Sequence, residues 1–193
     1  MKRILFLSVN CLLLLFGCGY QRNNEYERML RSMTIDIPLD SMEYLQPERG
    51  LLSFMLHKDK PDFRYVIYFD TATCATCKIN RIGIWNAIIK HTKEIGANTD
   101  FIFVFAPRHD IIKEFRTKFI ERKLNMPIYM DTTGIMERHN PLLSQSSIFH
   151  AFVLNDSDHI EVIGDASKSE LVERRYYEFL RKKMAEKECS VNH

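Results

Sequence analysis

Apolar residues along the chain gather in short runs, which are separated by segments with apolar side chains at helical spacing. Residues 63–69 read Phe-Arg-Tyr-Val-Ile-Tyr-Phe, a β-branched and aromatic run that predicts a strand. Residues 101–106 form an unbroken apolar run, which is typical of a strand covered on both faces. Shorter runs predict three more strands, over 128–130, 151–154 and 160–163. An Asn-Asp-Ser-Asp turn joins the last two of them.

Two of the intervening segments have the period of an amphipathic helix. Residues 74–95 carry apolar side chains at helical spacing, Trp85 among them, and are followed by Gly96 as a stop signal. This pattern predicts one long helix with Trp85 in the core. A second helix is expected around 109–123.

The chain after the last predicted strand favours a closing helix. Ser167 and Glu170 have the spacing of a capping box, and the helix that they open is expected to run to about Lys187. Strand and helix therefore alternate, and a hairpin and a final helix follow. This order predicts an α/β sandwich built on a mixed sheet.

The first eighteen residues have the pattern of an export signal. Two basic residues precede the mostly apolar run 4–16, which is too short to span a bilayer. The run ends in Leu-Phe-Gly-Cys, which resembles a bacterial lipobox with Cys18 as the lipidated residue, although Phe16 occupies a position that is usually small. We therefore expect a lipoprotein signal peptide over 1–17.

Composition divides the chain into five parts: signal peptide 1–17, lipid-anchored tether 18–31, N-terminal extension 32–60, domain 61–187 and tail 188–193. The chain has 27 basic and 25 acidic residues, which gives a formal net charge of +2. The two basic residues of the signal peptide account for this difference, so the rest of the chain is neutral. A neutral mature chain lacks the basic footprint of nucleic-acid binding. Lipid on Cys18 would anchor it in the bacterial cell envelope, and Gly19 favours the outer membrane, facing the periplasm.

Cys74, Ala75, Thr76 and Cys77 lie between the first central strand and the first long helix. Two thiols at this spacing on a first helical turn can close a small disulfide. Free N–H groups and partial positive charge at a helix start favour the thiolate, so we expect a lowered pKa for Cys74. Cys74 would attack and Cys77, one turn deeper, would resolve the mixed disulfide. Asp70 is a candidate proton acceptor.

A strand, a Cys-x-x-Cys motif at a helix start, a strand, a helix, a hairpin and a final helix together resemble the thioredoxin-like superfamily. The lipid tether is similar to that of its extracytoplasmic, TlpA-type members. The resemblance covers about residues 60–185. It implies a three-layer sandwich with a mixed central sheet flanked by helices. It also implies a thiol–disulfide oxidoreductase that acts on protein thiols and disulfides without a bound cofactor.

Several positions depart from this family pattern. Thr73 replaces the usual Trp before the first cysteine, and Ala-Thr replaces Gly-Pro between the two cysteines. Tyr68 stands where the family often has a buried acid. Phe149 stands where the family places a cis-proline, just before the strand that faces the dithiol. His150 follows it and is a candidate titrating partner of Cys74.

Other functions stay open at this stage. The missing Trp and cis-proline also fit a non-catalytic binding lipoprotein, in which Cys74 and Cys77 form a structural disulfide. Copper or zinc capture by Cys74, Cys77 and His150 is a further alternative, as is a peroxidase, because Thr71-x-x-Cys74 echoes a peroxidase motif. We expect no metal, a monomer and an unpaired Cys189.

Overall fold

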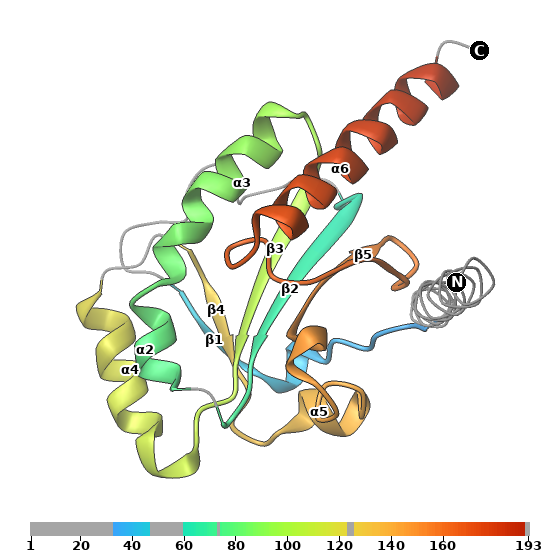
Figure 1. Cartoon of the computed structure of the whole chain (residues 1–193). Helices are drawn as coiled ribbons and strands as arrows, with labels where there is room; N and C mark the ends of the chain where they lie inside the picture. Colours follow the sequence, from blue (N-terminus) through green and yellow to red (C-terminus); the bar gives the residue numbers. More distant parts are fainter. Residues whose placement is uncertain (1–32, 47–59, 73, 123–125, 192–193) are drawn as a thin grey trace, which may run out of the picture. The chain divides into compact units, whose positions relative to one another are not determined.

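A mixed six-stranded sheet in the order β1-β4-β3-β2-β5-β6 organises the unit that begins at Ile35 (Figure 1). The structure is a computed structural model, and it describes residues 33–46, 60–72, 74–122 and 126–191. The predicted signal peptide, Cys18 and the tether lie outside these residues. The strands are β1 (Glu43–Leu45), β2 (Phe63–Phe69), β3 (Thr99–Phe105), β4 (Ile128–Met130), β5 (Ala151–Asn155) and β6 (Ile160–Ile163).

β2 occupies the middle of the sheet. It runs parallel to β3 and antiparallel to β5, so that Tyr65 lies between Phe101 and Val153. β3 continues parallel to β4, and β6 closes one side antiparallel to β5. The five predicted strands are confirmed. β1 was not predicted, and it adds part of the N-terminal extension to the far side of the sheet, antiparallel to β4.

The helices are α2 (Ala75–Ile79), α3 (Trp85–Glu94), α4 (Ile112–Glu121), α5 (Ile135–His139) and α6 (Glu170–Val191), with 3₁₀ turns at Leu39–Ser41, Ile82–Ile84, His109–Ile111 and Ser147–His150. α3, α4 and α6 pack on one face of the sheet and α5 lies on the other, which confirms the predicted α/β sandwich. The inward side chains of β2, such as Tyr65, share one core with Trp85, Phe115 and Tyr176 from α3, α4 and α6. Tyr68 points to the other face, as strand alternation requires, and contacts α5 there.

Tyr65 is the centre of the core. It is fully buried, and the Trp85 ring meets it edge-on at 4.9 Å between centroids. Its hydroxyl donates to the Gly164 carbonyl at 2.7 Å and accepts from the Ala166 N–H at 3.0 Å. Trp85 is 2% exposed, so its predicted place in the core is confirmed. The Tyr65 hydroxyl thus ties β2 to the segment that leads into α6.

Two predictions about helix boundaries are wrong. The single helix expected over 74–95 is divided into α2, a 3₁₀ turn and α3, because the N–H groups of Arg81 and Ile84 bond to carbonyls three residues back. Gly83 in this stretch also disfavours a continuous helix. The capping box of Ser167 does not form. Asp165 binds both the N–H and the hydroxyl of Ser167, and the Ser169 hydroxyl instead accepts from the first turn of α6.

No helix in the described part of the chain is long and apolar enough to cross a membrane.

The N-terminal extension is held by side chains rather than by a long strand. Asn140 accepts from the Asp36 N–H at 3.0 Å and donates to the Asp36 carbonyl at 2.6 Å. His139 lies 2.5 Å from the Asp36 carboxylate. These contacts fix the extension beside the end of α5.

Candidate dithiol site

Cys74 and Cys77 form a disulfide at the start of α2. α2 is the first helix after β2 in the chain (Figure 1). Their Cα atoms lie 5.2 Å apart. Cys74 is the N-cap of α2, and its sulfur accepts a hydrogen bond from the Cys77 N–H at 3.3 Å. The structure therefore places the two cysteines together at an end of the sheet where loops from several strands meet.

Cys77 is exposed, as Cys74 is, although we expected Cys77 to lie deeper. Ala75 and Ile79 are the buried residues of α2. They are one helical turn apart and define the inner face of this short helix. Cys77 lies between them in sequence and so projects away from the core. Both cysteines are consequently on the surface of the protein.

Asp70 and His150 lie together at the same end of β2. Asp70 follows the last residue of β2, and His150 ends the 3₁₀ turn before β5, whose first residue pairs with Ile67. The distance from Nδ1 of His150 to the Asp70 carboxylate is 4.0 Å. Nε2 of His150 lies 2.8 Å from the Leu143 carbonyl. Because a carbonyl only accepts, Nε2 carries the hydrogen and donates it to Leu143, and Nδ1 faces Asp70.

Tyr68 and Glu137 form a second polar pair that sequence reasoning missed. The Tyr68 hydroxyl donates to the Glu137 carboxylate at 2.8 Å, and the Tyr68 ring meets His150 edge-on at 5.3 Å. Burial, and then the nearby Glu137, raise the pKa of Tyr68 far above its ordinary value, so its hydroxyl stays protonated. No local signal marks Glu137, because it comes from α5, 69 residues along the chain.

Phe149 lies two residues before the start of β5, at the position where the family pattern has its proline. Its side chain is 4% exposed, and its N–H donates to the Ser146 carbonyl at 3.1 Å. The Ser146 hydroxyl accepts from the Ile148 N–H at 3.4 Å and so caps this 3₁₀ turn. The segment that leads into β5 is therefore a hydrogen-bonded turn with a buried phenylalanine.

The donor groups do not favour a metal site. In residues 33–46, 60–72, 74–122 and 126–191, no three His, Cys, Asp or Glu side chains are grouped so that they could hold a metal ion. His150 directs one nitrogen to Leu143 and the other toward Asp70. The geometry therefore gives no support to copper or zinc capture by Cys74, Cys77 and His150.

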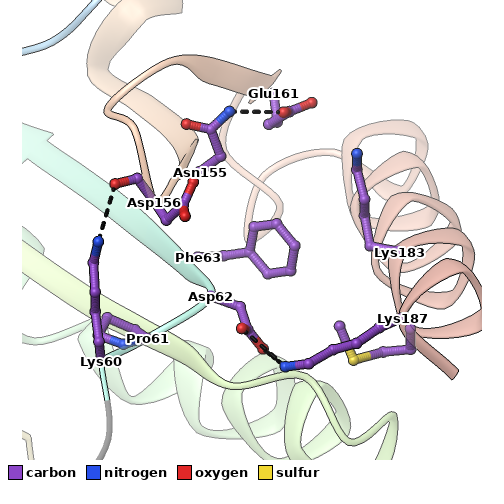
Figure 2. A pocket seen from close by; sticks show the side chains of 10 residues that line it. Lys60, Pro61, Asp62, Phe63, Asn155, Asp156, Glu161, Lys183 and Lys187 are labelled. Carbon is purple, nitrogen blue, oxygen red and sulfur yellow. Dashed lines mark hydrogen bonds and ion pairs between the residues drawn. The ribbon is translucent and has the colours of Figure 1, made fainter. Parts of the chain in front are cut away.

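A cleft of about 350 Å³ lies at the other end of the sheet (Figure 2). Phe63, the first residue of β2, forms part of its wall, whereas the dithiol follows the last residue of that strand. A strand of this length spans roughly 20 Å. Polar groups around the cleft pair with each other: Lys187 with Asp62 at 2.8 Å, and Asn155 with Glu161 at 3.0 Å. This cleft is separate from the dithiol.

The order of elements now decides the fold. The central strand β2 leads through the dithiol into helices and then into the parallel strand β3. The antiparallel hairpin β5–β6 completes the sheet, and α6 follows it. The fold is thioredoxin-like. α4 and β4 are inserted between β3 and α5, and β1 adds one edge strand to this core. The fold implied by the sequence resemblance is therefore confirmed.

Comparisons with known proteins give only distant likenesses. No family model and no curated protein matches the chain. Among solved structures, a thioredoxin-like protein in its oxidized form is 13% identical, with a TM-score of 0.42 over 76% of this chain and 99% of that one. The exposed lipoprotein thioredoxin Etrx1 of Streptococcus pneumoniae is 14% identical (TM-score 0.40; 64% and 86% covered). StoA of Bacillus subtilis is also 14% identical (TM-score 0.37; 60% and 84% covered). The strand order and connections, not these distant likenesses, carry the assignment of the fold.

Proposed function

We propose that this protein is a thioredoxin-like thiol–disulfide oxidoreductase that acts on protein thiols and disulfides. The observation that carries the proposal is the exposed Cys74–Cys77 disulfide at the start of the helix that follows the central strand. A disulfide that closes so short a loop stabilises a fold less than a long-range one would. Its exposure suits exchange with a partner better than it suits cross-linking of the fold.

The exchange transfers two electrons from the dithiol to a substrate disulfide. The Cys74 thiolate attacks one substrate sulfur, forms a mixed disulfide and releases the other sulfur as a thiolate. The Cys77 thiolate then attacks the Cys74 sulfur, restores the Cys74–Cys77 bond and releases the second substrate thiolate. The N–H of Cys77, which already bonds to the Cys74 sulfur, favours Cys74 as the thiolate. In the opposite direction the same steps oxidise a substrate dithiol.

Asp70 and His150 are the proposed groups for proton transfer. They are partly buried and lie beside each other, with Nδ1 of His150 directed toward the Asp70 carboxylate. A group that takes the proton of Cys77 during resolution would raise the rate of that step. Tyr68 and Leu143 hold the His150 ring in place through the contacts described above.

The same proposal includes anchoring in the bacterial cell envelope through lipid on Cys18. The basic start, the apolar run 4–16 and the Leu-Phe-Gly-Cys sequence support it. Residues 18–31 would then be the tether, 32–60 an extension, 61–187 the redox domain and 188–193 a tail. The outer membrane facing the periplasm is the proposed location, and the protein is proposed to act as a monomer.

A non-catalytic binding module is the second candidate. Phe149 favours it, because a buried aromatic side chain replaces the residue that exposes substrate backbone in the family pattern. In that case the Cys74–Cys77 bridge would resist reduction at ordinary glutathione ratios.

The test uses the mature chain from residue 18 with Cys18→Ser and Cys189→Ser, so that only the dithiol can exchange. The proposal predicts insulin reduction and glutathione exchange by this protein, and their loss in Cys74→Ser. Cys77→Ser should instead accumulate a mixed disulfide with a partner thiol. Restoring Cys189 alone is the matched control and should leave the rate unchanged. Exchange that is as fast in Cys74→Ser as in the parent would contradict the mechanism.

A further inference from the structure

Thr76, between the two cysteines, touches the Cys74 sulfur. Its Oγ1 lies 3.6 Å from that sulfur, within the reach of a hydrogen bond to an atom as large as sulfur. The cysteines are disulfide-bonded, so the Cys74 sulfur has no hydrogen to give. The Thr76 hydroxyl is therefore the donor. Together with the Cys77 N–H at 3.3 Å, it gives the Cys74 sulfur two donors.

These donors gain strength when the disulfide is reduced. A hydrogen bond to an ionised acceptor is about twice as strong as one between neutral groups. The Cys74 sulfur becomes such an acceptor only as a thiolate, so the hydroxyl stabilises the reduced protein more than the oxidised one. We propose that the Thr76 hydroxyl holds Cys74 as the thiolate of the reduced protein and thereby makes it the attacking sulfur. This inference rests on the proposed exchange function and names the residue that tunes it.

The contribution of the Thr76 hydroxyl can be tested separately from that of the backbone. Thr76 is half-buried in α2, and its hydroxyl is a side-chain group that a substitution can remove without changing the backbone. Valine has nearly the same shape and the same β-branching, but no donor. Serine keeps the donor and loses a methyl group. The charged and ionisable side chains on the surrounding elements stay constant in both variants: Asp70, Lys78, Arg81, Lys118, Glu121 and His150.

The experiment compares Thr76→Val and Thr76→Ser with the parent chain that carries Cys18→Ser and Cys189→Ser. The pH at which Cys74 ionises is measured in the reduced proteins from the rate of iodoacetamide alkylation, with Cys77→Ser added to isolate one thiol. Removing one hydrogen bond to the thiolate should lower the thiolate fraction about tenfold at a fixed pH below the titration. Thr76→Ser should stay within about twofold of the parent.

The Cys74–Cys77 reduction potential provides the second readout. Above the titration of Cys74 in both proteins, the same tenfold change makes the potential of Thr76→Val about 30 mV more negative. Equal values for Thr76→Val and the parent would overturn the role of Thr76. So would an equal shift in Thr76→Ser, because it would trace the effect to the lost methyl group. Failure of the proposed function is distinguishable, since the parent itself would then exchange no thiols.

Discussion

Phe149 lies in the 3₁₀ turn that leads into β5, and replacing it with proline is the sharpest test of what holds that turn together. The change would place at this position the proline of the family pattern. Here it removes a buried aromatic side chain, 4% exposed, at a cost of about 3–5 kcal/mol. It also removes the N–H that bonds to Ser146, worth about 1 kcal/mol. Proline further disfavours the helical conformation of Ile148, which precedes it.

Phe149→Pro should therefore lower the free energy of unfolding by about 4–6 kcal/mol. For a domain of this size the midpoint of thermal unfolding would fall by roughly 10–20 °C. Circular dichroism of the chain from residue 18 during heating measures the midpoint, and urea unfolding gives the free energy. Phe149→Leu keeps the N–H and much of the apolar volume, so it should cost clearly less. A Phe149→Pro protein within 1 kcal/mol of the parent would refute this account of the turn.

Two further predictions concern the core and the proton-transfer groups. Tyr65→Phe leaves the Gly164 carbonyl and the Ala166 N–H without their partner, so urea unfolding should show a loss of about 3 kcal/mol. Burial raises the pKa of Tyr65 far above its ordinary value, so its stabilising effect is complete below about pH 10 and is lost as the pH rises further. Tyr65→Phe should accordingly lose less stability above pH 10 than the parent, and an equal loss would contradict that cause. His150→Gln keeps a donor for Leu143 but has no ring nitrogen to accept a proton; it should slow glutathione exchange, whereas an unchanged rate would remove His150 from the mechanism.

The sequence predicts the elements that have strong periodic patterns. The buried strands β2 and β3 are dominated by apolar and aromatic residues, and α6 has apolar residues at helical spacing, so each could be located from composition and spacing alone. The dithiol was located in the same way, because two cysteines three residues apart after a strand are a local signal.

Elements that depend on distant partners could not be predicted. β1 has three residues and pairs with β4, which lies far along the chain. α5 has five residues, and its start is set by Asp131, whose buried carboxylate accepts the N–H groups of Ile135 and Met136. The division of the helix after Cys77 follows from a balance of weak propensities, which no periodic pattern displays.

The candidate site shows the same limit. Asp70 was proposed from its distance of four residues to Cys74, and His150 from its place before a strand. Their contact with each other, and the contact of Tyr68 with Glu137, join residues 69 or more positions apart. Such contacts are set by strand order and register, which the sequence pattern leaves undetermined.

The reduction potential of the Cys74–Cys77 pair tests the central claim most directly. The parent chain is equilibrated with glutathione buffers of known ratio, and the fraction of reduced dithiol is counted by thiol labelling and mass spectrometry. A thiol–disulfide oxidoreductase requires a labile bridge, so the account predicts a potential well above about −300 mV. A value at or below about −300 mV would identify a structural disulfide and contradict the proposed function.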